Sequence, residues 1–207
     1  VEMSASDAAA AVKAGQLKAA KLAEASIDQA VRLEQFGLFT SLKPELVMAS
    51  AEAVDRRLAA GEDVGAFAGV PFVVKDNIDT KDIPTTGAST AFAGWQPESD
   101  AAIVSALRRA GGVLLGKTNM HELAIGITCN NPVYGPVRNP YDREMIPGGS
   151  TGGTAAAISA RVAPAGLGTD TRRPVRTPAR RCGRVRFRTS PGRHPSPATV
   201  SDSRRVA

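Results

Sequence analysis

The stretch IPGGSTGGTAAAISA, residues 146–160, restricts the fold of this chain more than any other. Four glycines flank Ser150 and Thr151, and an alanine-rich run follows them. The run predicts a helix that begins at these glycines. Its very small side chains allow close packing against other backbone, and glycine permits backbone conformations that other residues avoid. Ser150 between glycines can take an unusual backbone conformation and hold its hydroxyl at the start of this helix.

Helical and strand-like segments alternate along the rest of the chain. Apolar residues at helical spacing predict helices within residues 4–34 (two helices), 44–60, 99–111 and 152–163. Short apolar runs predict strands within residues 36–42, 68–77, 112–119 and 163–170. Ser99 or Asp100 is expected to cap the helix within residues 99–111. The Pro/Gly-containing segments 81–98 and 131–149 are predicted loops. This alternation favours an α/β fold with a mixed or parallel inner sheet.

The charge is divided unevenly between the two ends of the chain. Residues 171–207 hold 11 arginines, one aspartate and no lysine, a net charge of +10. The first 170 residues hold 15 basic and 19 acidic groups, a net charge of −4. The sequence therefore predicts a mildly acidic body, followed by a basic segment that would be classed on its own as disordered or nucleic-acid-binding.

Composition excludes several protein classes. A length of 207 residues suits one domain. No apolar run reaches the roughly 20 residues that span a bilayer, and no signal peptide is visible at the start. The two cysteines, Cys129 and Cys182, provide no disulfide framework. We therefore expect a cytoplasmic protein without a membrane contact.

Two chemical uses of the glycine-rich loop can be weighed from the residues alone. A P-loop needs lysine followed by serine or threonine after its last glycine, but Thr154 and Ala155 follow Gly153, so nucleotide binding is disfavoured. Catalysis through Ser150 needs a base, because a serine hydroxyl is a weak nucleophile until a base takes its proton.

Lys75 is the better candidate base. The two histidines, His121 and His194, lie in contexts that do not support a Ser-His-Asp triad. Lys75 ends the apolar run GVPFVVK, where burial would lower its pKa from about 10.4 toward neutrality. The structural alternative is a strand-end lysine that reaches solvent and a glycine loop that only lets a helix pack closely.

Four segments taken together identify a family. GVPFVVKDNIDTKDIPTTGAS, GKTNMHELAIG, GPVRNPYDREMIPGGSTGGTAAAISA and APAGLGTDT resemble, in this order, the amidase signature family. The resemblance covers roughly residues 60–171. It implies an α/β amidase-signature fold with a mixed central sheet flanked by helices, whose C-terminal part is missing from this sequence. It also implies hydrolysis of a small-molecule carboxamide through an acyl-enzyme with ammonia release, no cofactor or metal, and a possible homodimer.

The resemblance assigns roles to individual residues. Lys75 matches the family's general base, and Ser150 matches the bridging serine that relays a proton after a cis peptide bond. Thr151 replaces the second serine of the family's loop. Gly149, Thr151 and the turn residues Thr171, Arg172 and Arg173 match substrate or oxyanion positions.

Pro174 occupies the position of the family's nucleophilic serine. The family's turn there has two glycines, and Arg172 and Arg173 replace them. Proline also lacks the backbone N–H that an oxyanion hole needs. The sequence thus predicts amidase descent with an inactive site. In the family pattern, Asp170 and Arg176 would form an ion pair that supports the turn.

The segment after residue 171 leaves three explanations open. It is a damaged gene or faulty sequence, a genuine pseudoenzyme, or a basic nucleic-acid-binding tail, and the first is favoured because the segment still follows the family pattern. We divide the chain into residues 1–171, the N-terminal part of an amidase domain, and 172–207, an aberrant continuation or a disordered tail. Nucleic acid is not the favoured partner.

Two other enzyme interpretations compete with a stand-alone amidase. The runner-up is the tRNA-dependent amidotransferase subunit of the same family, which takes ammonia from glutamine. The segment HELAIGITCNNPVYGPVRNPYD looks closer to mandelamide or indoleacetamide hydrolases. A nitrilase-like set of Cys129, Glu122 and Lys117 has the wrong order and context, so a packed cysteine is expected. His121 is expected to be structural.

Overall fold

The computed structural model of the chain describes residues 3–170 and 175–187. Its helices are α1 (Ala5–Lys13), α2 (Ala19–Arg32), α3 (Pro44–Ala59), α4 (Ala102–Arg109), α5 (Gly152–Ser159) and α6 (Arg176–Arg181). Its strands are β1 (Phe39–Leu42), β2 (Pro71–Lys75), β3 (Val113–Thr118), β4 (Asn130–Asn131), β5 (Gly135–Pro136) and β6 (Ala165–Leu167). Three 3₁₀ turns, η1 (Glu34–Phe36), η2 (Thr90–Phe92) and η3 (Glu122–Ala124), complete the described elements.

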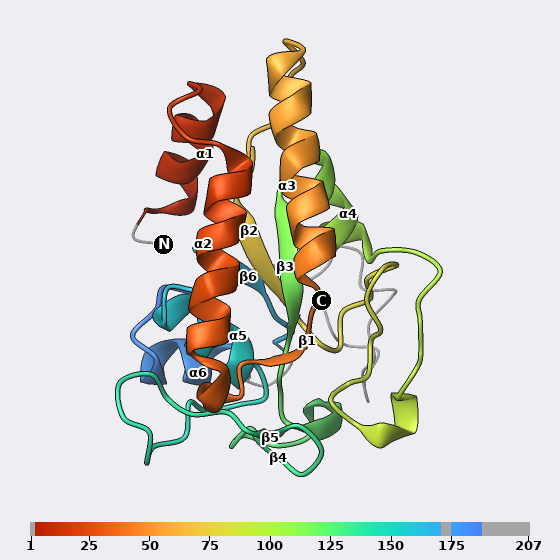
Figure 1. Ribbon diagram of the computed structural model, residues 1–207. Helices are drawn as coiled ribbons and strands as arrows, with labels where there is room; N and C mark the ends of the chain where they lie inside the picture. Colours follow the sequence, from red (N-terminus) through yellow and green to blue (C-terminus); the bar gives the residue numbers. More distant parts are fainter. Residues whose placement is uncertain (1–2, 171–174, 188–207) are drawn as a thin grey trace.

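A four-stranded mixed sheet forms the centre of the molecule (Figure 1). Its strand order is β1-β3-β2-β6, with β2 parallel to both neighbours and β1 antiparallel to β3. The parallel strands β2 and β3 are fully buried, which explains why their sequences are apolar runs rather than alternating patterns. The expected α/β fold with a mixed central sheet flanked by helices is confirmed.

Each face of the sheet has its own hydrophobic core. Helices α2, α3 and α5 pack with Val73, Val113 and Leu115 on one face. On the other face, Val104 of α4 packs with Phe72 and Val74. Successive residues of a strand point to opposite faces, so neighbours along β2 belong to different cores. This alternation decides where the polar residues at the end of β2 lie.

Helix α5 packs as closely as its small residues predict. Seven of its eight residues are buried. A Cβ atom added to Gly153 would lie 2.2 Å from the carbonyl oxygen of Asn119, and one added to Gly152 would lie 2.6 Å from the sulfur of Cys129. Side chains at these positions would push the start of α5 away from the sheet. Gly152 and Gly153 therefore determine how closely α5 approaches β2 and β3.

Two details differ from the sequence-based expectations. The residue that precedes α4 is Ala101, and no side chain caps this helix. Asp100 instead accepts a hydrogen bond from the backbone of Lys81 at 2.9 Å and lies 3.3 Å from Arg108 as an ion pair, so a tertiary contact replaces the local cap. The long segment 131–149, predicted to be loop, contains part of the short β4–β5 pair.

The arginine-rich segment that follows residue 174 begins with a helix. α6 packs against α5, and Ser159 donates a hydrogen bond to the carbonyl oxygen of Cys182 at 2.8 Å. Both cysteines are free. The described helices include none that is long and apolar enough to cross a membrane.

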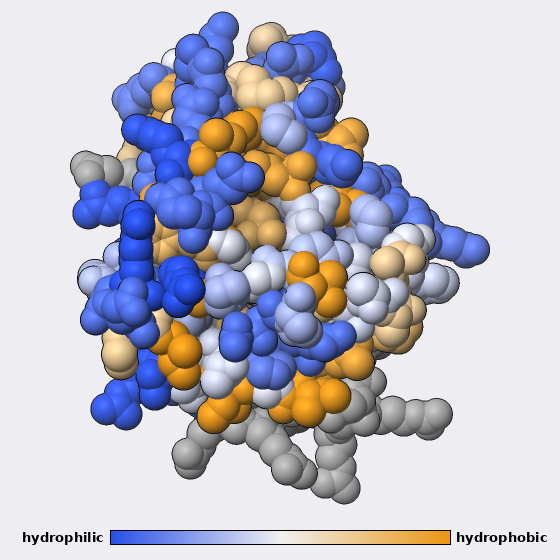
Figure 2. All heavy atoms as spheres, turned by 60° about the horizontal axis from the view of Figure 1, so that its bottom comes forward, coloured by the Kyte–Doolittle hydropathy of each residue, from blue (hydrophilic) through white to orange (hydrophobic). Residues whose placement is uncertain are grey.

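The loop end of the molecule exposes apolar side chains. Figure 2, which brings the bottom of Figure 1 forward, shows hydrophobic patches among hydrophilic residues. In the loops between β3 and α5, Ile125 and Ile127 are 70% and 71% exposed, and Tyr141 and Met145 are also exposed. This surface lies in the part of the chain that precedes the glycine-rich loop.

Candidate active site

The side chains of Lys75 and Ser150 meet in the interior of the molecule. Lys75 Nζ donates a hydrogen bond to Ser150 Oγ at 2.8 Å, and both residues are fully buried. Lys75 is the last residue of β2, and Ser150 lies two residues before α5. The strand end and the helix start converge because α5 packs directly on β2. The structure thus brings together the two residues that the sequence singled out as base and relay.

The backbone around Ser150 is held from two sides. The peptide bond between Gly149 and Ser150 is cis, as the family resemblance implies. The carbonyl oxygen of Ser150 accepts hydrogen bonds from the backbone N–H of His121 at 3.2 Å and from Cys129 Sγ at 3.4 Å. These contacts orient the Ser150 side chain toward Lys75.

A second hydroxyl, that of Thr169, completes the polar cluster. Lys75 Nζ also donates to Thr169 Oγ1 at 2.8 Å, and Asn77 Nδ2 donates to the same oxygen at 3.2 Å. Thr169 lies in the turn that follows β6 and carries its hydroxyl to the edge of the site. Thr169 lies in the segment APAGLGTDT that resembles the family, but the sequence did not indicate that it contacts Lys75. Asn77 was missed, although its place two residues after Lys75 at the end of a buried strand is the signal that could have found it.

Burial lowers the pKa of the Lys75 amine. Desolvation lowers the pKa of its amine from 10.5 to about 7, while nearby Cys129 and Asp170 oppose this shift. A substantial fraction of the amine is therefore neutral near pH 7, with a lone pair that can accept a proton. A solvent-exposed strand-end lysine, the structural alternative, is excluded for this residue.

The turn after β6 is supported as the family pattern implies. Asp170 Oδ2 lies 3.3 Å from Arg176 Nε, and Asp170 is almost completely buried. Thr151 Oγ1 donates a weak hydrogen bond to the Thr169 carbonyl at 3.5 Å. The ion pair and this contact connect the glycine-rich loop, the turn and α6.

Four of the sequence-predicted positions lie outside the described residues. They are Thr171, Arg172, Arg173 and Pro174. Gly149 and Thr151, the other two predicted substrate or oxyanion positions, are buried beside Ser150. The described part of the site therefore consists of Lys75, Ser150 and the residues that contact them.

The alternative nitrilase-like set does not form a centre. Burial raises the pKa of the Cys129 thiol to about 11, which disfavours a thiolate nucleophile. Glu122 accepts a hydrogen bond from Ser89 at 2.6 Å, and Lys117 contacts a different group of residues on the other face of the sheet. Within residues 3–170 and 175–187, no three His, Cys, Asp or Glu side chains are grouped so that they could hold a metal ion.

Comparison with known proteins shows the family of the chain. The family model described as Amidase matches residues 21–204. The chain belongs to the amidase family. It is 44% identical over 186 residues to a glutamyl-tRNA(Gln) amidotransferase subunit of Thermobifida fusca, and 46% identical over 180 residues to that of Acidothermus cellulolyticus. These alignments cover 89% and 86% of this chain but only 37% and 35% of the relatives.

Solved structures give the same family with other activities. The chain resembles the peptide amidase of Stenotrophomonas maltophilia with a TM-score of 0.82 and 33% identity, over 86% of this chain and 38% of that one. It resembles a 6-aminohexanoate cyclic dimer hydrolase with a TM-score of 0.80 and 30% identity, over 88% of this chain and 37% of that one. The amidase chain therefore spans less than two fifths of these relatives.

Proposed function

We propose that this amidase chain carries the proton-transfer part of a carboxamide-cleaving site, with Lys75 as general base and Ser150 as relay. The observation that carries this proposal is the 2.8 Å contact between a fully buried amine and the Ser150 hydroxyl. A buried lysine with a pKa of about 7 is suited to take and return a proton near neutral pH.

The proposed proton path runs through Ser150. Neutral Lys75 takes the proton of the Ser150 hydroxyl, and Ser150 in turn takes the proton of the attacking hydroxyl. Attack on the amide carbon then forms an acyl-enzyme, and the same path returns a proton to the departing nitrogen, which leaves as ammonia from a primary amide. The hydrogen bond from Asn77 to Thr169 fixes the second acceptor of Lys75 and limits how far the amine can turn.

The family position of the attacking hydroxyl holds Pro174 in this chain. Ser150 lies against the amine rather than free in a cleft, so it suits the relay role better than that of the nucleophile. The proposed function is therefore amidase chemistry by descent, in a chain that lacks the acyl-accepting serine. The chain with Pro174 is expected to be active only if another hydroxyl group takes the place of the missing serine.

Two substrate classes fit the family. The curated relatives are named as amidotransferase subunits, which favours an amide donor used within a complex. The neighbouring solved structures include a peptide amidase and a cyclic-dimer hydrolase, which favours a stand-alone hydrolase. We propose a small carboxamide as substrate, with glutamine as the alternative.

A panel of amides separates these classes. A version with glycine at 172 and 173 and serine at 174 is expected to release ammonia from phenylacetamide-type amides faster than from glutamine. Ammonia is measured for each substrate at equal concentration, with and without the partner subunits of an amidotransferase. Release from glutamine alone would transfer the assignment to the amidotransferase class.

A second candidate function rests on an arginine-lined cleft. A cleft of about 860 Å³ is lined by Arg176, Thr177, Arg180, Arg181, Arg184 and Arg186. Guanidinium groups bind phosphate oxygens in pairs, and like charges this close repel each other until an anion is bound. The exposed ring of Phe187 follows directly and offers a stacking surface for a base. These features favour binding of single-stranded nucleic acid by a non-catalytic protein.

Oligonucleotide binding tests this second candidate. The triple variant Arg180→Gln, Arg181→Gln, Arg186→Gln is expected to weaken binding of a fluorescent 12-mer at least about tenfold at low salt, by loss of phosphate contacts. The control, Arg32→Gln, Arg56→Gln, Arg109→Gln, removes the same charge from residues elsewhere on the surface. The logarithm of the wild-type affinity should fall with the logarithm of salt concentration by about 0.7 per phosphate contact. Equal losses in both variants, or no binding by the wild type in an anisotropy titration, would exclude a role for the cleft.

A further inference from the structure

A second buried lysine, Lys117, lies on the strand next to that of Lys75. Lys117 on β3 is fully buried, as Lys75 is. In the parallel register, Lys117 pairs with Val74 and Thr118 pairs with Lys75. Because neighbouring strand residues point to opposite faces, Lys75 faces α5 and Lys117 faces the segment that follows β2. The amidase site described above uses only the first of these lysines.

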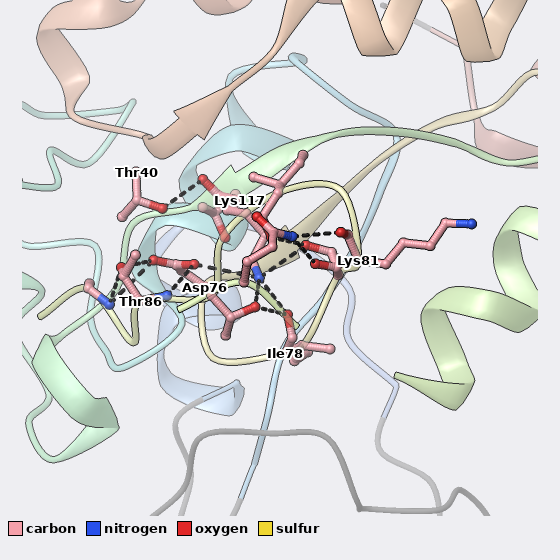
Figure 3. Close-up of polar contacts among 12 residues, drawn as sticks. Thr40, Asp76, Ile78, Lys81, Thr86 and Lys117 are labelled. Atoms are coloured by element: carbon pink, nitrogen blue, oxygen red, sulfur yellow. Dashed lines mark hydrogen bonds and ion pairs between the residues drawn. The ribbon is translucent and has the colours of Figure 1, made fainter. Parts of the chain in front are cut away.

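The ammonium of Lys117 has a complete set of oxygen partners (Figure 3). Its Nζ donates to the carbonyl oxygen of Ile78 at 2.6 Å and to Thr85 Oγ1 at 2.7 Å, with a longer contact to Thr80 Oγ1 at 3.4 Å. It lies 3.6 Å from Asp76 Oδ1 as a buried ion pair. The Lys117 side chain thus contacts residues along the whole loop from residue 76 to residue 85.

Asp76 connects Lys117 to the turn at residues 86–88. Its carboxylate accepts hydrogen bonds from the hydroxyl and the backbone N–H of Thr86 and from the N–H of Ala88. Its backbone N–H donates to the carbonyl oxygen of Thr118 at 3.2 Å, and its own carbonyl accepts from Gly87 at 2.9 Å. Asp76 directly follows Lys75, so this network anchors the residue next to the proposed base.

The same turn contacts the segment that supports Ser150. The carbonyl oxygen of Gly87 accepts from the backbone of Leu123 at 2.8 Å. Asn131 Nδ2 donates to the carbonyl oxygens of Ala88 and Met120, at 2.8 and 3.2 Å. The residue after Met120, His121, donates its backbone N–H to Ser150. The Lys117–Asp76 ion pair, these hydrogen bonds and the peptide bonds between neighbouring residues therefore connect Lys117 to both members of the Lys75–Ser150 pair.

We propose that Lys117 is a positioning residue of this site, and that its charged form, paired with Asp76, holds Lys75 and Ser150 in their relative places. The proposal rests on the proposed function of Lys75. It assigns the two buried lysines opposite requirements, since Lys75 works as the neutral amine and Lys117 as the cation. A neutral Lys117 would have one N–H fewer for its oxygen partners and no charge to balance Asp76.

The surroundings allow both requirements to be met at one pH. Burial lowers the pKa of Lys117 to about 8, although Asp76, Asp79 and Asp82 face it and raise it. Lys75, with Cys129 and Asp170 nearby, has a pKa of about 7. The three acidic neighbours of Lys117 therefore keep its amine protonated to a higher pH than that of Lys75. Above about pH 8 the ion pair with Asp76 loses its cation.

The chain as printed can test this by NMR without turnover. It has seven lysines, so ¹³Cε-labelled lysine gives a simple spectrum, in which Lys75→Met and Lys117→Met assign the two buried amines. We expect the backbone amide signals of Ser150 and His121 to shift in two steps, one with each amine. Burial lowers the pKa of the His121 ring below its usual value and raises that of Cys129 to about 11, so their own titrations lie outside this window.

Two variants test whether the second step comes from the Lys117–Asp76 pair. The double variant Asp76→Asn, Lys117→Met replaces the pair by neutral groups and should remove the second step while the Lys75 step persists. Lys81→Met, which removes an exposed lysine of the same segment, should keep both steps. Ser150 and His121 signals that follow Lys75 alone in the wild type, or a second step that survives in the double variant, would overturn the proposal. If the double variant does not fold, the wild-type titration decides. Since no substrate is involved, the absence of amide hydrolysis leaves this test intact.

Discussion

Replacing Arg172 and Arg173 by glycine and Pro174 by serine is expected to raise amide hydrolysis by about 10⁶-fold over the chain as printed. Loss of the nucleophile in serine hydrolases costs about this factor, and a lost oxyanion donor costs about 10²–10³ in turnover. The printed chain has no hydroxyl at position 174, and the N–H that a turn residue would offer there is absent. Ammonia release from phenylacetamide under saturating substrate measures the difference.

The control for this prediction separates the turn from the hydroxyl. Arg172→Gly with Arg173→Gly but with Pro174 kept should remain near the background rate. Because this chain covers 37% of the Thermobifida fusca relative, all versions are also compared within a chain of the relative's length. Turnover by the printed chain that Lys75→Ala abolishes would show that another hydroxyl, Ser150 or Thr171, attacks the amide.

Lys75→Met is tested in the variant Arg172→Gly, Arg173→Gly, Pro174→Ser. It is expected to lower kcat by about 10²–10⁴-fold, the usual contribution of a general base. Methionine keeps the length of the buried side chain but cannot accept a proton from Ser150. In the parent with Lys75, kcat/KM should fall below a pH of about 7, because the protonated amine has no lone pair. Activity across pH 5 to 9, in steps of about half a unit, measures both effects.

Two controls make the Lys75 prediction specific. Lys81→Met removes an exposed lysine six residues further along the chain and should leave kcat unchanged. Ser150→Ala should cost about as much as Lys75→Met, and the two together little more than either, because groups of one proton path act as a unit. Losses that multiply in the double variant would contradict the relay.

The order of elements could be predicted from the sequence because it depends on local patterns. Apolar runs of strand length, alternating with helical periodicity, led to the mixed α/β sheet. The glycines at 152 and 153 predicted the close approach of α5, since a side chain there collides with Asn119 or Cys129. The pairing of Lys75 with Ser150 came from the family resemblance, because 75 residues separate the two.

Other features depend on which face a residue occupies, and this is decided by strand register. Lys117 and Lys75 both end buried apolar runs, yet β2 and β3 pair so that one lysine faces α5 and the other faces Asp76. A break in the register between Phe72 and Val73 shifts this pairing, and no local pattern announces it. Asp100 likewise does not cap α4 as expected, because its carboxylate pairs with Arg108 and accepts a hydrogen bond from the backbone of Lys81.

The sequence by itself determined what chemistry the chain carries: a lysine at a buried strand end, a serine in a glycine-rich loop, and proline where the family has its nucleophile. Only the tertiary structure decided how these groups work together. It gave Lys75 the partners Ser150 and Thr169 and lowered its pKa by removing water, and it placed the Lys117–Asp76 pair behind the same strand. The physical reason is that desolvation and hydrogen bonding act through space. Their strength depends on packing between segments that are far apart in the chain.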